Sequence, residues 1–289
     1  MVFSAMSKSA NNARRPGFTL VELLVVVSII AILASLLLPA LSGARGRADG
    51  ISCLGNARQL TFAWQLYAND FNGVLPYNLG MNGSSFRTNL NWVDNVMTWD
   101  LSPDNTNTAT ITDAGLGSYA GGAPRVQRCP SDHALSAIQR AAGWDHRIRS
   151  YSMNAMIGNA GSFLNNGVNI NNPTYKQFLS ITQITHPSDI FVFLDEHPDS
   201  IDDGYFINKD PETANNSGAE WIDLPASYHN NSAAISFADG SALLHHWLNP
   251  TTLPPSEPNA ANLPISLPAA PADAQADFNW ILSHMSIEY

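Results

Sequence analysis

A long apolar run near the N-terminus constrains this chain more than any other feature. From Phe18 to Leu38 there are 21 residues, and Glu22 is the only charged one among them. As a helix rising about 1.5 Å per residue, the run would measure roughly 31 Å, close to the hydrocarbon thickness of a bilayer. A carboxylate inside such a helix costs on the order of 2.5–3.5 kcal/mol at the centre and less near an end. It therefore needs a partner and, by default, indicates a function.

Three kinds of N-terminal segment combine a basic flank with an apolar run. A secretory signal peptide fits the basic residues that precede the run, but its apolar core has only about 7–15 residues and gives Glu22 no role. A plain single-pass anchor explains the length and would keep the basic end cytoplasmic. It leaves both Gly17 and Glu22 unexplained.

The hexapeptide at residues 17–22, "GFTLVE", fits a third kind of segment. It closely resembles the G-F-T-L-x-E signature that opens the apolar helix of type IV pilins and type II secretion pseudopilins. The resemblance implies that a prepilin peptidase cuts after Gly17 and that the new N-terminal Phe18 is N-methylated. It also implies that the carboxylate of Glu22 pairs with the N-terminal amine of a neighbouring subunit and so sets the register of filament assembly.

Charge and composition limit the partners. The predicted leader, residues 1–17, holds three cations and no acid, so its removal would change the formal charge from −10 to −13. An acidic chain with only 14 Lys and Arg is a poor general DNA binder, so no nucleic-acid partner is expected. The expected partners are the prepilin peptidase/methyltransferase, other pilin or pseudopilin subunits, and the bacterial inner membrane. The N-terminus is expected in the cytoplasm, with the head periplasmic or extracellular.

The N-terminal helix is expected to cover residues 18–72, with residues 18–38 in the membrane. Pro39 would remove a backbone hydrogen bond and kink the helix. Beyond it, apolar residues spaced by four and three positions indicate an amphipathic helix that packs on a globular head. This stripe consists of Cys53, Ala57, Leu60, Trp64 and Tyr67.

The head is assigned to residues 73–248, and its strand signals are strongest near its end. "IFVFL", residues 190–194, suits a central strand. "AAISFADGSALLHHW", residues 233–247, indicates a β-hairpin with its turn at Asp239-Gly240. These elements predict an α+β, pilin-like fold, in which a long N-terminal helix packs on a head with an antiparallel sheet.

The C-terminal segment, residues 249–289, begins with a stretch rich in Pro, Ala, Asn and Ser. Up to residue 275 it has too few large apolar residues to build a core, so we expect it to lie on the surface. A short docking helix follows, with an apolar stripe at Phe278, Ile281, Leu282 and Met285.

A second resemblance covers much of the head. His229 stands ten residues before Asp239-Gly240 in "YHNNSAAISFADG", which looks like the H-X9-DG motif of a pilin-like bacterial family. Ser241 follows this motif where the family leads us to expect His. Four other segments look like the same family: "CLGNARQL" (53–60), "RCPSD" (128–132), "RSYSMNAMIG" (149–158) and "LDEHPDSIDDGYF" (194–206). The resemblance implies a pilin-like fold and no known enzymatic activity.

No enzyme is expected in the head. His229, Asp239 and a serine are present, but a triad is recognised by geometry, and the sequence has no G-x-S-x-G elbow. We expect Asp239-Gly240 to be the hairpin turn and the side chain of His229 to bond a loop backbone.

The chain has two cysteines, Cys53 and Cys129, which are too few to form a four-ligand zinc site by themselves. A disulfide between them would close a loop of about 75 residues and contribute on the order of 4 kcal/mol. We favour this bond; two free buried thiols are the alternative.

An acidic segment at residues 195–203 is the sequence's candidate metal site. Its carboxylates are the hard oxygen ligands that Ca²⁺ takes, although their spacing does not match an EF-hand. The five candidate ligands are Asp195, Glu196, Asp199, Asp202 and Asp203. The alternative is a solvated acidic turn with Asp capping contacts. No other cofactor is expected.

Taken together, these features predict a major or minor structural subunit of a type II secretion pseudopilus or a type IV pilus-like filament. A membrane-anchored extracytoplasmic module that binds, for example, polysaccharide is the alternative from another class.

Overall fold

The computed structural model describes residues 19–80, 88–210, 220–259, 263, 265–267 and 272–289. The chain divides into two compact units, residues 1–45 and 46–289. Helix α1 (Leu20–Asp70) begins in the first unit and ends in the second, within two residues of the predicted bounds at both ends. Its helical conformation is unbroken through Pro39, and the kink expected there stays a prediction.

Helix α1 ends where two left-handed residues reverse the chain. Asn72 and Gly73 have φ angles of 52° and 87°, and the Gly73 N–H donates to the carbonyl of Ala68 at 2.7 Å. Glycine and asparagine adopt positive φ at the lowest cost, which is why they terminate helices. The turn signal "NDFNG" predicted this ending.

The head is built on a five-stranded mixed sheet with the strand order β5-β1-β4-β7-β8. The strands are β1 (Tyr151–Asn154), β4 (Phe191–Asp195), β5 (Tyr205–Phe206), β7 (Ser232–Phe237) and β8 (Ala242–His246). Strand β4 is central and wholly buried, as predicted for "IFVFL". The predicted antiparallel pairing holds for β1, β4, β7 and β8, whereas edge strand β5 pairs with β1 in parallel.

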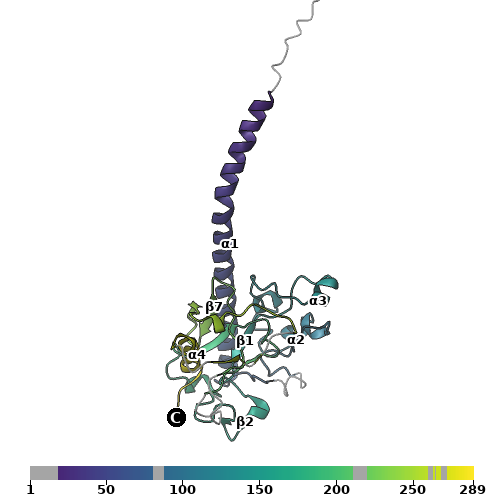
Figure 1. The fold of residues 1–289 in the computed structure, drawn as a ribbon. Helices are drawn as coiled ribbons and strands as arrows, with labels where there is room; N and C mark the ends of the chain where they lie inside the picture. Colours follow the sequence, from purple (N-terminus) through teal and green to yellow (C-terminus); the bar gives the residue numbers. More distant parts are fainter. Residues whose placement is uncertain (1–18, 81–87, 211–219, 260–262, 264, 268–271) are drawn as a thin grey trace, which may run out of the picture. The chain divides into compact units, whose positions relative to one another are not determined.

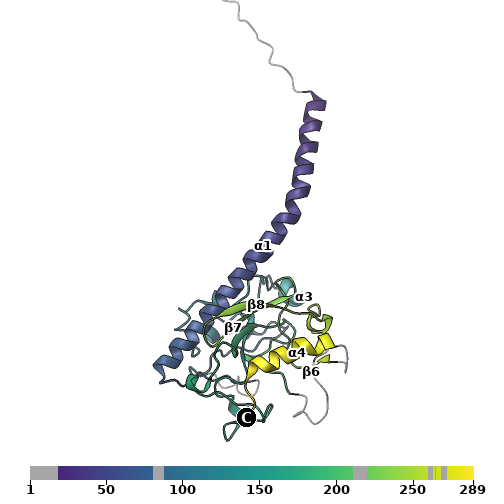
Figure 2. The ribbon, with the colours of Figure 1, turned by 90° about the vertical axis from the view of Figure 1, so that its left-hand side faces the viewer.

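Two helices cover the two faces of this sheet. In the second unit, α1 packs Leu60 and Trp64 into one core together with Phe193. Helix α4 (Ala272–Met285) packs its predicted stripe into the other core, against Phe191 and Ile235. Figure 1 shows this part of α1 beside β7 and β1, and Figure 2 shows α4 below β7 and β8. The order of layers in the head is therefore helix, sheet, helix.

The predicted hairpin is confirmed. Strands β7 and β8 pair from Ser232 with His246 to Ser236 with Ala242. Gly240 has a φ of 89°, and the Asp239 carboxylate accepts from the Ser241 N–H at 2.8 Å.

The remaining elements are short. They are the helices α2 (Ala109–Thr112) and α3 (Ala137–Ala141), the strand pair β2 (Leu164–Asn165) and β3 (Val168–Asn169), the pair β6 (Glu220–Trp221) and β9 (Ile265–Ser266), and five 3-10 turns: η1 (Pro103–Asn105), η2 (Pro124–Gln127), η3 (Gly161–Phe163), η4 (Ile181–Gln183) and η5 (Pro250–Thr252).

The expectation of a surface-lying stretch over residues 249–275 was partly wrong. Strand β9 within it pairs with β6, and Leu267 is buried in the core that α4 covers. Thr252 is buried as well, and its hydroxyl donates to the Asp277 carboxylate at 2.9 Å. The stretch has few large apolar residues, but backbone pairing and single buried side chains still attach it to the head.

Candidate functional site

The apolar N-terminal part of α1 is long enough to span a membrane. Residues Leu20–Leu38 form the one described helix that passes this test of length and composition. None of these side chains is buried within the part of the chain that the structure describes. The predicted processing residues, Gly17 and Phe18, lie outside the described residues.

Glu22 closes the N-terminus of α1 by a reciprocal contact with Thr19. The backbone N–H and the hydroxyl of Thr19 lie 2.8 and 2.7 Å from the Glu22 carboxylate, and the Glu22 N–H donates to the Thr19 hydroxyl at 3.2 Å. This is a capping box, which satisfies helix N–H groups that have no partner in the first turn. Our reading of the sequence missed it, although the T-x-x-E spacing was the signal.

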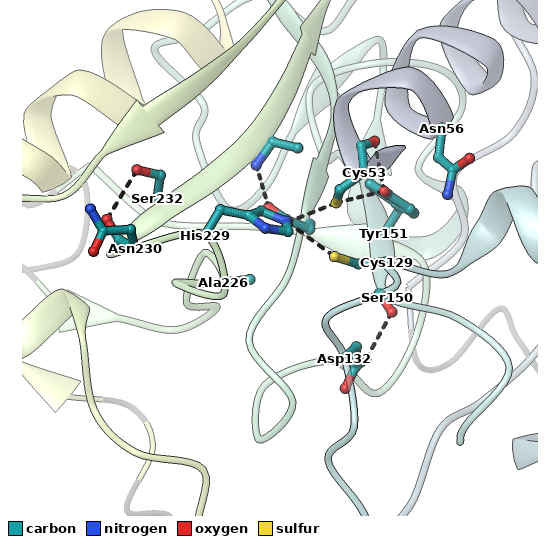
Figure 3. A network of polar contacts seen from close by, with 12 residues as sticks. Cys53, Asn56, Cys129, Asp132, Ser150, Tyr151, Ala226, His229, Asn230 and Ser232 are labelled. Atoms are coloured by element: carbon teal, nitrogen blue, oxygen red, sulfur yellow. Dashed lines mark hydrogen bonds and ion pairs between the residues drawn. The ribbon is translucent and has the colours of Figure 1, made fainter. Parts of the chain in front are cut away.

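The head contains a buried group of two thiols, a carboxylate and an imidazole, which we call the Cys–His cluster. Its ligand-type atoms all lie within 4.8 Å of one another. The nearest distances are 3.2 Å between Cys129 Sγ and His229 Nε2, 3.3 Å between Cys53 Sγ and Asp195 Oδ2, and 3.5 Å between His229 Nε2 and Asp195 Oδ2. Figure 3 shows the His229 ring directed at both cysteines.

Four separate parts of the head supply the cluster. Cys53 lies on α1, and Cys129 follows the 3-10 turn η2. Asp195 is the last residue of the central strand β4, and His229 lies in the loop before β7. Cys53 and His229 are 176 residues apart in the sequence, so only the tertiary fold brings the four together.

Tyr151 on β1 completes the surroundings of the cluster. Its hydroxyl donates to the backbone carbonyl of Cys53 at 2.8 Å and lies 2.8 Å from Cys53 Sγ. The Ala234 N–H donates to the other carboxylate oxygen of Asp195, at 2.7 Å. Each of the five family-like segments quoted above thus contributes one residue: Cys53, Cys129, Tyr151, Asp195 and His229.

Burial and close packing shift the ionisation of the cluster. Burial raises the pKa of the Cys53 thiol well above its usual value. A hydrogen bond with the Cys129 thiol and the charge of Asp195 raise this pKa further. Burial likewise raises the pKa of Asp195. Burial disfavours the charged form of the His229 ring and would lower its pKa. Hydrogen bonds with Asp195 and Cys129 outweigh burial and raise the pKa to about 10.

Cys129 differs from Cys53 in the direction of its shift. Burial would raise the pKa of the Cys129 thiol, but hydrogen bonds with Cys53 and His229 lower this pKa below its usual value. The thiolate is the form of cysteine that binds metals and reacts, and the lowered pKa favours this form at Cys129 over Cys53.

The predicted disulfide is not formed in the structure, because both cysteines are free buried thiols. They are neighbours in space, as that prediction required, but each also contacts a further polar group: Asp195 in the case of Cys53, and His229 in the case of Cys129. The alternative of two free buried thiols describes them better.

The expectation for His229 was wrong. Its ring contacts the side chains of Cys129 and Asp195 instead of a loop backbone. Asp239 and Gly240, at the other end of the H-X9-DG motif, form the hairpin turn, as expected. The two ends of the motif therefore occupy different places in the head.

The carboxylates of the acidic segment have separate partners. Asp199 accepts from Ser256 and from the Glu257 N–H, at 3.1 and 2.6 Å. The Asp202 carboxylate accepts from the Asp203 N–H at 2.7 Å, and the Asp203 carboxylate accepts from the Tyr205 N–H at 2.7 Å.

Glu196 is buried, and desolvation raises its pKa to about 8. Of the five candidate calcium ligands, only Asp195 belongs to a group that the described residues bring close enough for a metal ion. Calcium binding by this segment stays a prediction.

Comparison with known proteins bears on the N-terminus alone. The family model described as "Prokaryotic N-terminal methylation motif" matches residues 12–38. No curated protein and no solved structure matches the chain. The chain therefore carries a prepilin-type N-terminus, which implies processing by a prepilin peptidase and assembly with other pilin subunits.

Proposed function

We propose that the mature chain is a structural subunit of a type II secretion pseudopilus or a type IV pilus-like filament. The observation that carries this proposal is the prepilin-type motif at residues 12–38, joined to an apolar helix whose side chains are not buried by any of the described residues. The motif spans both the predicted cleavage point and the helix.

The exposed apolar surface of α1 supports a role in assembly. Side chains around the whole helix are exposed between Leu20 and Leu38, with Leu36, Leu37 and Leu38 each at least 66% accessible. Such a surface is stable only in lipid or against other apolar helices, because water around it is unfavourable. Insertion in the membrane before assembly and packing between helices afterwards supply these two environments.

The proposed location follows from charge. Three basic residues and no acid precede the apolar run, whereas two arginines and one aspartate follow it closely, and this balance favours a cytoplasmic N-terminus and a head outside the inner membrane. After cleavage the amine of Phe18 would be the cation nearest to Glu22, four residues away in sequence. The proposal is that this amine, from a neighbouring subunit, pairs with the Glu22 carboxylate in the filament.

We also propose that the subunit has no enzymatic activity. Asp239 lies in the exposed hairpin turn and His229 lies in a buried cluster, and this separation supports the proposal. A structural subunit needs only a stable head and a processed helix.

Mass spectrometry of the chain purified from membranes tests the proposal. The expected result is a chain that lacks residues 1–17 and begins with N-methylated Phe18. A strain without prepilin peptidase is the control, and there the chain should keep its leader. An intact N-terminus in the wild-type strain, or a cut near Ala44, would refute the proposal and favour the membrane-anchored binding module.

A further inference from the structure

We propose that the Cys–His cluster of the head is a structural zinc site. The ligands are the Sγ atoms of Cys53 and Cys129, the Asp195 Oδ2 and the His229 Nε2. Zinc bound here would join α1, the end of β4 and two loops of the head at one point.

The spacing of the four atoms fits a tetrahedral ion. Zinc binds sulfur at about 2.3 Å and imidazole nitrogen or carboxylate oxygen at about 2.0–2.2 Å, which places neighbouring ligand atoms about 3.3–3.7 Å apart in a tetrahedron. The three nearest pairs of the cluster lie 3.2, 3.3 and 3.5 Å apart. The other three pairs lie within 4.8 Å, so receiving the ion requires these atoms to approach one another by about 1 Å at most.

The chemistry of the ligands selects zinc. Two thiols exclude the hard cations Ca²⁺ and Mg²⁺, which take oxygen ligands, and the mixture of sulfur, nitrogen and oxygen suits Zn²⁺. Four protein ligands fill a tetrahedral zinc ion and leave no position for a substrate. The exposed fractions of the four residues are at most 6%, which also describes a closed structural site and not a catalytic one.

Neighbouring groups hold two of the ligands in position. The Ala234 N–H binds the Asp195 Oδ1, so the Oδ2 of that carboxylate is directed into the cluster. The Tyr151 hydroxyl fixes the backbone and the thiol of Cys53. Hydrogen bonds of this kind orient metal ligands and tune their affinity.

The His229 ring is positioned by α1. A Cβ atom added at Gly50 would lie 3.4 Å from the His229 Nδ1 and 3.3 Å from a methyl carbon of Leu244. The ring therefore lies in direct reach of this part of α1, which bounds it on its Nδ1 side.

Zinc and a Cys53–Cys129 disulfide are mutually exclusive. Zinc binding displaces one proton from each thiol and the Nε2 proton of the His229 ring and keeps both sulfurs reduced, whereas a disulfide removes both thiols by a two-electron oxidation. Thiols that bind a metal ion are protected from that oxidation. The state of the two cysteines in the purified chain therefore distinguishes the two outcomes.

The first experiment measures zinc in the full chain, purified in detergent with a histidine-free affinity tag. We expect one zinc ion per chain by elemental analysis. Replacing it with Co²⁺ should give the near-ultraviolet charge-transfer absorption of cobalt–thiolate bonds. Removing zinc with a chelator should lower the Tm by roughly 10 °C, and added Zn²⁺ but not Ca²⁺ should restore it.

Variants assign the ligands. Cys129→Ser and His229→Gln should each bind at least tenfold less zinc, whereas the control Asp199→Asn should keep one ion per chain. If a ligand variant does not fold, the Co²⁺ spectrum of the wild-type chain still decides the question. A wild-type chain with two titratable thiols and no zinc after incubation with Zn²⁺, or with a Cys53–Cys129 disulfide as isolated, would overturn the proposal.

Discussion

The Thr19 hydroxyl lies 2.7 Å from the Glu22 carboxylate, and the Glu22 N–H donates to the same hydroxyl at 3.2 Å. Glu22 therefore has a local partner before any neighbouring subunit arrives. A capping box uses the side-chain oxygen of the third helical residue as an acceptor and does not require a charge there. The local role and the proposed assembly role of Glu22 can be separated for this reason.

Glu22→Gln should keep the helix cap and abolish filament formation. Glutamine retains an acceptor oxygen for the Thr19 N–H, but it cannot form an ion pair with the N-terminal amine of a neighbour. Thr19→Ala is the matched control, because it breaks the box and leaves the carboxylate charged. We expect filament yield, measured at equal membrane levels, to fall at least tenfold in the glutamine variant and much less in the alanine variant.

Equal losses in the two variants would indicate that the helix cap, and not the charge, is what assembly requires. Normal filament yield in Glu22→Gln would remove the inter-subunit pair from the proposal, although the prepilin-type processing would stand.

Local patterns predicted the long elements of the fold. The helix 18–72, the central strand β4, the β7–β8 hairpin and α4 each have a periodicity or a turn signal within a single window of sequence. The parallel edge strand β5 and the β6–β9 pair have two residues per strand. Such short strands have no periodicity of their own, and distant backbone partners determine them.

The candidate site was visible only in separate pieces. The sequence suggested a role for each member of the Cys–His cluster: a disulfide for Cys53 and Cys129, calcium for Asp195 and a loop contact for His229. No local pattern relates these positions, because β4 and the loop before β7 meet α1 only in the folded head. Tyr151 was missed as an individual residue, since a tyrosine in a strand has no signal that distinguishes it from other core residues.

Gly158 is expected to tolerate no side chain. Its φ is 82°, and an added Cβ would lie 2.0 Å from the carbonyl oxygen of Pro76. Gly158→Ala should therefore reduce the free energy of unfolding by about 3 kcal/mol or more, from backbone strain and the clash together. Gly121 is the control: it has a φ of 69°, and an added Cβ would meet no atom within 4 Å.

For Gly121→Ala only the strain remains, about 1 kcal/mol. Denaturant unfolding of the two variants under the same conditions measures the difference. If both variants lose the same stability, the close approach of Pro76 to Gly158 is not a constraint.

The last prediction concerns His245, whose ring stacks on Trp280 at 3.8 Å between centroids and contacts Trp247 at 4.4 Å. Burial lowers its pKa to about 4; the charge of Asp277 opposes this shift, and His284 and His246 add to it. Below its usual pKa of about 6.5, the unfolded chain binds a proton at this position that the folded chain does not bind. The stability that His245 contributes is therefore complete above pH 6.5 and falls as the pH decreases towards 4.

His245→Phe should remove this dependence, because phenylalanine stacks on Trp280 without a proton to bind. The ring is partly exposed, so solvent screening limits the effect to the order of 1 kcal/mol. Urea unfolding of the wild-type chain and the variant at pH 7, 5.5 and 4.5 measures it as a stability difference that grows in favour of the variant at lower pH. Parallel stability curves for the two chains would show that proton binding at His245 does not couple to folding.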